Sequence, residues 1–414
     1  MKSDDFDTIV IGAGPAGSTA AALLAEKGHH VALLEKTKFP RYHVGESLMP
    51  FCYFPLERLG LTNQMDEIGF TKKFSVQFVT EDGSQSRPFY FFEHYDHPSS
   101  TTWQVLRSQF DELIMDKARE NGAEVRELTT VKSFIEESGN IVGVNAISPD
   151  SEAYQLNAPM VIDASGRDTI AQNKHKWKKR DPELNKIAIW TYYKAAKRDP
   201  GLDAGSTTVA YLPGKGWFWY IPLEGDIVSV GIVAEREYLY NDTRNLSEIF
   251  SREIKNNLWI DEHLKCGEQF GKYWSTGEYS YRSEFCATNG LLLAGDAYAF
   301  LDPVFSSGVF LALKSGEMAA DAVSNAITNN DFSAGQFNDY GKELCKGIEA
   351  MRALVYAFYD ESFSFGDLIK SNPDLRGDLT DCLIGDVFKD FTKLFGAVSD
   401  FATVPSKLKH GLVA

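Results

Sequence analysis

The segment that most constrains the fold is residues 7–35, where two short apolar runs flank a run of small residues. Asp7–Gly12 is typical of a buried parallel strand, and Val31–Glu35 is typical of a second one. Between them, Pro15–Lys27 predicts a helix whose small side chains face a sheet and which ends before Gly28. A helix that joins two parallel strands is the βαβ unit of nucleotide-binding sheets. We therefore expect a parallel sheet with a ligand at the carboxyl ends of its strands.

A glycine pattern lies between the first strand and the helix. Gly12 permits a tight turn, Gly14 lets the backbone approach a pyrophosphate, and Gly17 lets helix and strand pack closely. Glu35 ends the second strand, where a carboxylate accepts hydrogen bonds from a ribose 2′-hydroxyl and would repel a 2′-phosphate. The pattern predicts a dinucleotide other than NADP.

Three further features favour FAD over NAD. Arg41–Ser47 follows the second strand, Arg107 begins a predicted helix from which it could reach a pyrophosphate, and Asp296 ends a late strand, where it could hold a ribityl hydroxyl. A turn or helix-cap role is the alternative for Asp296. With these features the chain resembles the flavin monooxygenase superfamily, whose members use them to bind FAD. The expected FAD-binding residues are Gly12, Gly14, Ala16, Gly17, Glu35, Lys36, Arg41, Ser47, Arg107, Val131, Asp296, Pro303 and Gly308.

The stretch Phe300–Gly308 lies between a strand-like run at 291–296 and a helix-like run at 309–327. Its Ser-Ser-Gly end opens the predicted helix. A helix start presents backbone N–H groups without intrahelical partners at the positive end of the helix dipole. The stretch therefore predicts a site for a small anion.

Two spaced motifs narrow the resemblance. Trp217 and Trp219 belong to a Trp-x-Trp-x-Ile-Pro sequence and share one face of a predicted strand. Periodicity alone favours a core strand with large aromatic side chains. A second motif, Phe-x-x-Pro-x-x-Ser-x-Gly, begins at Phe300 and ends at Gly308. Together with the FAD motifs, these sequences resemble the two-component flavin-dependent halogenases, from the N-terminus to about Gly316.

The resemblance implies a mechanism. A separate flavin reductase supplies FADH2, which reacts with dioxygen to form a C4a-hydroperoxide. A chloride or bromide ion beside the flavin attacks it, and the resulting hypohalous acid travels to a lysine near the organic substrate. By the same resemblance, the amides of Ser307 and Gly308 bind the halide, whereas Trp217, Trp219 and Phe305 separate the substrate from the flavin.

Two adjacent residues, Lys72 and Lys73, compete for the lysine role. In the strand-like run 70–79, Lys73 shares its face with Ser75 and Gln77, as expected for a cavity wall, and the family's spacing also favours Lys73. A lysine suits the task because its ammonium can donate to hypohalous acid and because burial lowers its pKa. The alternative is a pair of surface lysines on a strand edge.

Position 305 bears on the substrate. The family branch that acts on free tryptophan has a glutamate immediately before the motif serine, and this chain has Phe305. A carboxylate helps a poorly reactive ring by stabilising its cationic intermediate. Phenols and pyrroles need this help less. We expect a small phenolic or pyrrolic substrate, either free or attached to an acyl or peptidyl carrier protein, although Ser75 and Thr80 depart from many members of that branch.

The fold class expected is α+β. It combines an α/β FAD-binding domain of the glutathione-reductase type, an inserted substrate domain built on an antiparallel sheet, and a helical C-terminal region. The expected boundaries are 1–70, 105–180 and 285–330 for the FAD-binding domain, 71–104 and 181–284 for the substrate domain, and 331–414 for the helical region.

Composition restricts the partners. A net charge of −16 disfavours nucleic acid and anionic membranes. No uncharged apolar run approaches the roughly 20 residues that span a bilayer, and residues 1–7 lack the basic start of a signal peptide. The five cysteines are scattered without a Cys-x-x-Cys pair, which predicts a reduced, cytoplasmic protein without a metal site.

Other functions within the same superfamily remain open at this point. A single-component flavin hydroxylase would bind NAD(P)H itself and hydroxylate an aromatic ring, and a prenyl-chain reductase would work without halide. A non-enzymatic flavin-binding module is disfavoured by the large inserted domain. Halide dependence and the need for a partner reductase distinguish the halogenase.

Overall fold

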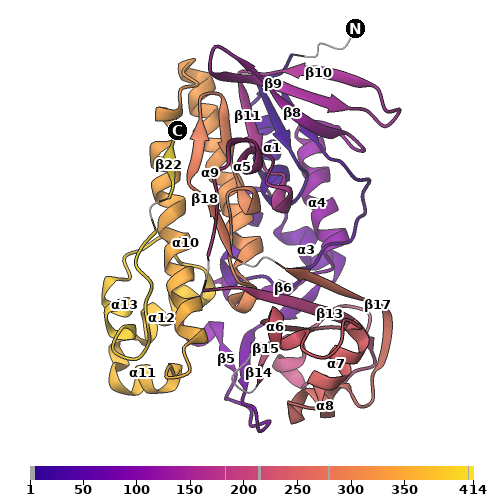
Figure 1. Ribbon diagram of the computed structural model, residues 1–414, viewed down its shortest axis with the longest axis vertical. Coiled ribbons are helices and arrows are strands. Elements are labelled where there is room, and N and C mark those ends of the chain that lie inside the picture. Colours follow the sequence, from indigo (N-terminus) through magenta and orange to yellow (C-terminus); the bar gives the residue numbers. More distant parts are fainter. Residues whose placement is uncertain (1–4, 182, 213–215, 278–279, 409) are drawn as a thin grey trace.

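A parallel sheet forms one half of the molecule (Figure 1). The computed structural model describes residues 5–181, 183–212, 216–277, 280–408 and 410–414, so part of the predicted segment 1–7 lies outside it. The seven strands lie in the order β22-β19-β20-β11-β1-β2-β7, and only the β19–β20 pair is antiparallel. Their bounds are β1 Thr8–Ile11, β2 Val31–Leu34, β7 Glu124–Arg126, β11 Met160–Asp163, β19 Phe285–Thr288, β20 Leu291–Leu293 and β22 Leu412–Val413.

Helices cover this sheet. The predicted helix after the glycine pattern is α1 (Pro15–Glu26), which contacts both α4 (Arg107–Glu120) and α9 (Ser307–Asn329). A Cβ atom at Gly316 of α9 would lie 2.3 Å from the carbonyl oxygen of Ala16, so α9 crosses α1 backbone to backbone. The close crossing holds the start of α9 beside the glycine turn. The short helix α5 (Ile170–His175) follows β11.

A second seven-stranded sheet forms the other half, in the order β17-β13-β16-β15-β14-β4-β5 (Figure 1). It is antiparallel except that β4 and β14 run parallel, so the predicted antiparallel sheet is mixed at this one pair. The strands are β4 Ser75–Val79, β5 Phe89–Tyr90, β13 Lys186–Lys194, β14 Thr207–Leu212, β15 Gly216–Pro222, β16 Ile227–Glu235 and β17 Glu268–Gly277.

The two faces of this second sheet have different neighbours. One face packs on three short helices, α6 (Arg236–Leu239), α7 (Leu246–Ile254) and α8 (Leu258–Leu264), through a separate apolar cluster that includes Phe218 and Tyr220. The other face carries Trp217, Trp219 and Ile221 and belongs to the main core. The alternation predicted for β15 is therefore present, and the motif tryptophans face the parallel-sheet half.

Smaller sheets and helices connect the halves. The strand-like run 70–79 is divided at Phe74, because β3 (Thr71–Lys73) pairs with β6 (Thr102–Gln104) whereas β4 joins the large sheet. Two short helices precede it, and two three-stranded sheets lie beside the parallel sheet. These elements are α2 Tyr53–Arg58, α3 Thr62–Ile68, β8 Thr130–Glu137, β9 Asn140–Ile147, β10 Ala153–Asn157, β12 Lys178–Arg180, β18 Tyr281–Ser283 and β21 Ala299–Phe300.

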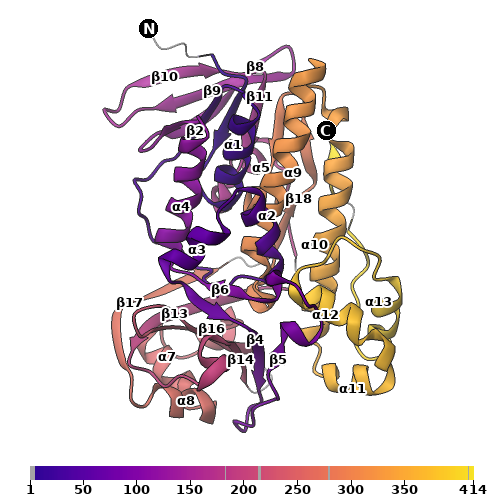
Figure 2. The same ribbon diagram turned by 180° about the vertical axis from the view of Figure 1, so that it is seen from behind.

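The C-terminal region is helical up to its last strand. Helix α10 (Asn338–Tyr359) runs beside α9, and α11 (Phe365–Ser371), α12 (Arg376–Ile384) and α13 (Thr392–Val398) cluster at its far end (Figure 2). The chain then returns, and β22 pairs with β19 of the parallel sheet. The last residues are thus part of the parallel sheet, while α10 and α11 reach the second half.

The predicted fold class is confirmed: a Rossmann-like parallel sheet, an inserted β-rich region and a helical C-terminal region are all present. Within the described residues, no helix combines the length and the apolar character needed to cross a membrane. The same residues contain no group of three or more His, Cys, Asp or Glu side chains placed to hold a metal ion.

Candidate active site

A cavity of about 460 Å³ lies between the parallel sheet and the second sheet. The turn between β1 and α1, the segment 41–47, the β15 tryptophans and the loop before α9 all contribute to its wall. The predicted site residues that line it are Gly12, Gly14, Ala16, Glu35, Lys36, Arg41, Ser47, Arg107, Val131, Trp217, Trp219, Asp296, Pro303 and Gly308. Gly17, Lys73, Phe305 and Ser307 lie behind this wall.

The glycine turn leaves its backbone open to a ligand. Gly12 has φ +95°, and a Cβ atom there would lie 2.4 Å from the carbonyl oxygen of Ala164. A Cβ atom on Gly17 would lie 1.9 Å from the carbonyl oxygen of Gly12, so these two positions fit only glycine. By contrast, the nearest atom to a Cβ on Gly14 is the Arg41 guanidinium at 3.6 Å. The turn therefore provides a backbone surface that a pyrophosphate can approach.

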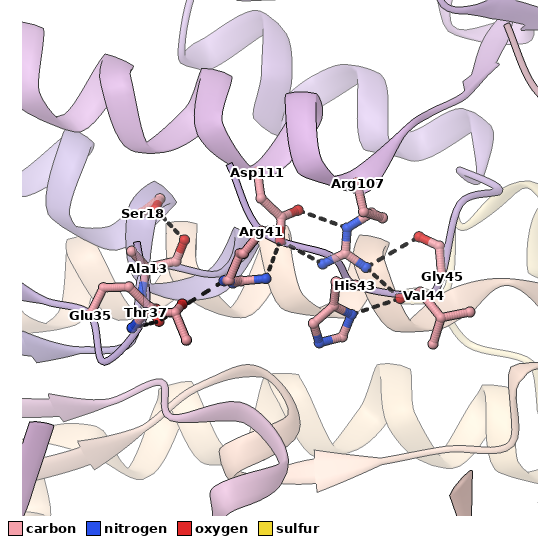
Figure 3. A network of polar contacts seen from close by, with 10 residues as sticks. All are labelled: Ala13, Ser18, Glu35, Thr37, Arg41, His43, Val44, Gly45, Arg107 and Asp111. Atoms are coloured by element: carbon pink, nitrogen blue, oxygen red, sulfur yellow. Dashed lines mark hydrogen bonds and ion pairs between the residues drawn. The ribbon is translucent and has the colours of Figure 1, made fainter. Parts of the chain in front are cut away.

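Glu35 closes one end of this surface (Figure 3). Its Oε2 accepts a hydrogen bond from the Ala13 amide at 2.9 Å, and its Oε1 accepts one from the Thr37 amide at 2.9 Å. The carboxylate is thus held at the end of β2 and is 4% exposed, facing the cavity. This is the position from which a carboxylate can accept hydrogen bonds from ribose hydroxyls. Lys36, next to it, pairs with Asp168 across the cavity mouth.

Arg107 is engaged within the protein (Figure 3). Its Nε and Nη2 donate to the Asp111 carboxylate at 2.7 and 3.0 Å, and its Nη1 donates to the carbonyl oxygen of Val44 at 2.8 Å. Arg41 also donates to Asp111, at 3.1 Å. The sequence predicts that Arg107 could reach a pyrophosphate, and that contact stays a prediction; the structure shows that Arg107 holds the segment around Val44 against α4.

Asp296 lies in the 3₁₀ turn Gly295–Ala297 that follows β20 and lines the cavity. Burial raises its pKa to about 6, and the positive charges of Arg167 and Arg107 oppose this shift. Its backbone carbonyl accepts a hydrogen bond from Tyr281 at 3.0 Å. Burial disfavours the ionised form of this carboxyl group. Because the group faces the cavity, it is suited to bind hydroxyl donors of a ligand.

The start of α9 faces the same cavity. Ser306 precedes the helix in the left-handed conformation (φ 56°), and its side chain makes no capping hydrogen bond to the first turn. A Cβ atom built on Gly308 would meet no described atom within 4 Å, so there is open space in front of this residue. Uncapped amides, the dipole of a long helix and open space together fit a small anion.

Lys73 is the buried member of the lysine pair. It is 2% exposed, and its Nζ donates to Ser47 Oγ at 2.9 Å and to the Leu48 carbonyl oxygen at 3.1 Å. The Nζ also lies 5.6 Å from the centre of the Phe91 ring. Burial lowers the pKa of Lys73 to about 7, so a large fraction of its amine is neutral near neutral pH.

Lys72 has a different environment. It forms an ion pair with Asp66 at the surface, and its Nζ lies 5.0 Å from the centre of the Trp103 ring. Successive residues of a strand point to opposite sides, so β3 turns Lys73 inward and Lys72 outward. Lys73 is thus the buried member of the pair and Lys72 the more exposed one.

The motif tryptophans are fixed by hydrogen bonds. Trp217 Nε1 donates to the Tyr359 hydroxyl at 2.9 Å, and Trp219 Nε1 donates to Ser229 Oγ at 3.1 Å. The centres of the two rings lie 6.2 Å apart on the cavity side of β15. Both rings therefore form a fixed part of the cavity wall.

Phe305 lies behind the wall, against the C-terminal helices. Its ring centre is 5.8 Å from that of Phe358 and 6.2 Å from that of Phe365. Phe358 also contacts Tyr211 at 5.2 Å and Trp217 at 6.4 Å between ring centres. Helices α10 and α11 thus complete an aromatic cluster on the far side of the tryptophans, a contribution that the sequence did not predict.

The residues present fit FAD. The two positions where a Cβ atom would collide shape a backbone cradle, Glu35 is placed for a ribose and Asp296 for a polyhydroxyl chain. The aromatic wall formed by Trp217 and Trp219 suits a flat ring system.

Sequence reasoning also missed two single residues of this site. Tyr359 joins two motifs, since it accepts from Trp217 and donates to Asp302 Oδ2 at 2.8 Å. Glu46 is a buried carboxyl group in the cavity wall, held by the Tyr192 hydroxyl. The sequence did contain a signal for Glu46, because the residue lies between Arg41 and Ser47 in the segment expected to bind FAD.

Comparison with known proteins agrees with this site. The tryptophan halogenase family model matches residues 7–101 and 93–364. The chain is 34% identical over 386 residues to the 1H-pyrrole-2-carbonyl peptidyl-carrier protein brominase of Pseudoalteromonas luteoviolacea, which covers 92% of each chain. It is 30% identical over 413 residues to the corresponding chlorinase of Pseudomonas fluorescens, over 94% of this chain and 91% of the relative.

A solved structure shows the same arrangement. The flavin-dependent brominase Bmp2 superposes with a TM-score of 0.87 and 30% identity, over 96% of this chain and 97% of that chain. The resemblance drawn from the sequence motifs is thereby confirmed. The chain belongs to the tryptophan halogenase family and is a flavin-dependent halogenase, an oxidoreductase that uses FAD and a halide ion.

Proposed function

We propose that this enzyme halogenates a pyrrole ring that is attached to a peptidyl carrier protein, and that Lys73 presents the oxidised halogen to the ring. The observation that carries the proposal is the position of Lys73. Its amine is fully buried, lies one hydrogen bond behind the cavity wall and has a pKa lowered to about 7. A partly neutral, dry amine is suited to bind hypohalous acid.

Each side of the wall has a task in this proposal. The amides at Ser307 and Gly308, at the start of α9, hold the halide next to the flavin ring. When bound, reduced FAD supplies with dioxygen the oxidising power that converts halide to hypohalous acid. Trp217 and Trp219 keep the organic substrate away from that chemistry, and Ser47 leads from the cavity to Lys73.

The substrate class rests on the aromatic cluster and on the relatives. Position 305, a glutamate in the branch that acts on free tryptophan, is here a phenylalanine packed against Phe358 and Phe365, which suits an electron-rich ring. The two relatives named above act on pyrrole-2-carbonyl groups of a peptidyl carrier protein, as their names state. A phenol is the second substrate class.

Other parts of the sequence-based prediction belong to this proposal as well. A separate flavin reductase delivers the reduced flavin. The three-part domain division, with boundaries near residues 70, 105, 180, 285 and 330, separates cofactor binding from substrate binding. The five cysteines are free thiols in the structure, which supports a reducing, cytoplasmic setting.

Product mass analysis tests the proposal. The enzyme, a flavin reductase, NADH, dioxygen and bromide or chloride are incubated with pyrrole-2-carbonyl carrier protein, free pyrrole-2-carboxylate or a panel of phenols. Halogenated carrier-bound pyrrole is expected, with little product from free pyrrole-2-carboxylate. A product that is hydroxylated or reduced equally well without halide would contradict a halogenase, and product from phenols alone would move the substrate to the second class.

A further inference from the structure

A buried carboxyl group lies in the cavity wall without a role in the proposal above. Glu46 is 2% exposed and lines the cavity. Its Oε1 accepts a hydrogen bond from the Tyr192 hydroxyl at 2.7 Å; among the described residues its Oε2 has no partner at hydrogen-bond distance, although the Ser229 hydroxyl lies near enough to lower the pKa of the group. A buried carboxyl with one unpaired oxygen in a cavity wall is costly to keep unless that oxygen meets a ligand or transfers a proton.

A chain of hydroxyl groups connects this carboxyl to the surface. Tyr192 Oη lies 2.9 Å from Tyr42 Oη, and the Tyr42 side chain is 42% exposed. Trp190 Nε1 donates to Tyr42 Oη at 2.5 Å. An indole nitrogen only donates, so it occupies a lone pair of Tyr42 and leaves the Tyr42 proton free to point at Tyr192. Tyr192 in turn donates to Glu46, so every O–H in the chain points inward.

The chain is also held in place. The Tyr42 ring stacks on Trp274 of β17, with 4.3 Å between centres and an angle of 16°. Tyr192 and Trp190 belong to β13, which is paired with β16 on one side and β17 on the other. Both steps, Tyr42 to Tyr192 and Tyr192 to Glu46, therefore meet at a residue that the sheet holds in place.

Three groups face the Glu46 carboxyl from three elements: Tyr192 on β13, Ser229 on β16 and Arg107 at the start of α4. Burial raises the pKa of Glu46 to about 7, whereas Tyr192, Ser229 and the charge of Arg107 act in the opposite direction. The group can therefore both hold and release a proton near neutral pH.

The reaction requires a proton at this place. Halide oxidation balances as FADH2 + O2 + X⁻ + H⁺ → FAD + HOX + H2O, so one proton is consumed in the cavity per turnover. Dioxygen accepts four electrons, two from the halide and two from the reduced flavin, and the consumed proton leaves in water. The competing reaction, FADH2 + O2 → FAD + H2O2, needs no proton from outside.

We propose that Tyr42, Tyr192 and Glu46 form a proton relay that carries one proton per turnover from solvent to the halide side of the cavity, with Glu46 as the donor. This inference rests on the proposed halide oxidation. A relay that fails shifts the outcome from hypohalous acid to hydrogen peroxide.

Three variants test the relay. Glu46→Gln keeps the shape and the acceptor for Tyr192 but has no acidic proton. Tyr192→Phe interrupts the chain and leaves the donor in place. Tyr193→Phe is the matched control, because Tyr193 is the next residue of β13 and faces the α7–α8 cluster on the other side of the sheet.

The activity measurement separates the two products. Enzyme loaded with reduced FAD is mixed with dioxygen and bromide, and oxidant is captured with monochlorodimedone while hydrogen peroxide is assayed in parallel. In the wild type, the share of turnovers that give captured oxidant and not hydrogen peroxide is expected to fall as the pH rises through about 7, where Glu46 loses its proton. Capture occurs before transfer to the substrate, so a Lys73→Ala background gives the same profile.

The variants should differ in a characteristic way. With Glu46→Gln, we expect monochlorodimedone to capture at least about tenfold less oxidant at every pH. Hydrogen peroxide should rise by a matching amount, and the captured oxidant should not depend on pH near 7. Tyr192→Phe should give a normal first turnover, because Glu46 begins protonated, and a several-fold slower steady state with a larger solvent isotope effect. Tyr193→Phe should match the wild type.

A second measurement does not depend on activity. Infrared difference spectra of the protein between pH 5 and pH 9 should contain a protonated-carboxyl band that titrates near 7 in the wild type, titrates at a higher pH in Tyr192→Phe, which loses the hydrogen bond that lowers the pKa of Glu46, and is absent in Glu46→Gln. Oxidised FAD should bind all four proteins with similar affinity.

Each outcome decides the question. Loss of captured oxidant with unchanged FAD affinity and the missing band supports the relay. Captured oxidant within twofold of the wild type in Glu46→Gln overturns it, and so does a loss that accompanies weakened FAD binding, since Glu46 would then be a structural residue. If the wild type itself yields no captured oxidant, the proposed halide oxidation fails and not the relay.

Discussion

The amine of Lys73 lies 2.9 Å from the hydroxyl oxygen of Ser47. Ser47 is part of the cavity wall, whereas Lys73 lies behind it. Ser47 Oγ also lies 2.8 Å from Thr207 Oγ1, which receives a further hydrogen bond from Gln104. The lysine is thus separated from the flavin compartment by one side chain. In the proposed mechanism, a small polar residue at this point lets hypohalous acid approach the amine while larger molecules stay on their own side.

Replacement of Lys73 should separate oxygen consumption from halogenation. Lys73→Ala removes the group that presents the oxidised halogen, so we expect the halogenated product to fall by about 100-fold or more while flavin oxidation continues. Lys72→Ala is the matched control because its ammonium pairs with Asp66 at the surface. It should keep product formation within about twofold, since surface ion pairs contribute little. The reverse pattern would show that the strand register assigned to β3 is wrong.

The Lys73 amine should also affect stability in a pH-dependent way. Its pKa is about 7 in the folded protein and 10.5 for an ordinary lysine in water, so between these values the unfolded chain binds the extra proton. Stability should then rise with pH across this window, by about 1.4 kcal/mol per pH unit from this group. Lys73→Met lacks the titration, so the difference in unfolding free energy between wild type and variant should move in favour of the wild type from pH 7 to pH 9. If the free energies of urea unfolding of the wild type and of Lys73→Met change equally with pH over that range, the amine of Lys73 does not have a lowered pKa.

Ser47→Ala tests the passage to Lys73 directly. The amine would keep only the Leu48 carbonyl among its two hydrogen-bond acceptors, at a cost of about 1 kcal/mol for the lost bond. We expect a several-fold fall in product, with hypohalous acid lost to solvent and captured by monochlorodimedone. Ser47→Thr, which retains the hydroxyl, should recover most of the product. A Ser47→Ala enzyme with normal coupling of oxygen to product would show that the hydroxyl has no part in the transfer.

The local motifs were accessible from the sequence because each depends on spacing of a few residues. The turn at Gly12, the shared face of Trp217 and Trp219, and the helix start at Ser307 follow from the periods of strand and helix. The fold class followed from the same signals and from the resemblance they carried.

The pairings across the cavity were not accessible. Tyr359 and Trp217 are 142 positions apart, and Glu46 and Tyr192 are 146 apart, so no local pattern relates them. The break of the predicted strand at Phe74 also depends on which partner strands arrive from elsewhere. Such contacts are decided by tertiary packing, which overrides local propensity.

Tyr359 should tie the C-terminal region to the halide site. It accepts from Trp217 and donates to Asp302, whose Oδ1 accepts from the Val304 amide in the loop before α9. Tyr359→Phe leaves a buried indole N–H and a buried carboxylate oxygen without this partner, which should cost about 1–3 kcal/mol of stability. Since the loop loses a support, the KM for halide should rise several-fold while FAD affinity stays the same.

Tyr356→Phe provides the comparison for this effect. Tyr356 lies one turn earlier on α10 and bonds to Asp181, away from the cavity lining. Loss of the Tyr356 hydroxyl should lower the free energy of unfolding to a similar degree without a change in the KM for halide. Equal halide KM values in the two variants would mean that Tyr359 supports the fold alone.

Gly308 allows stability and halide binding to be changed in opposite directions. A Cβ atom at this position meets no described atom within 4 Å, and alanine is a better helix former than glycine, so Gly308→Ala should fold normally and gain about 0.5–1 kcal/mol. The same methyl group occupies the space in front of the uncapped amides where we place the halide. We therefore expect the KM for bromide or chloride to rise at least about tenfold, as for a lost ion contact of 1.4 kcal/mol or more.

Gly316→Ala is the contrasting variant, because its Cβ would lie 2.3 Å from the Ala16 carbonyl oxygen and should destabilise the α1–α9 crossing. Unchanged halide KM in a stable Gly308→Ala enzyme would place the ion elsewhere in the cavity.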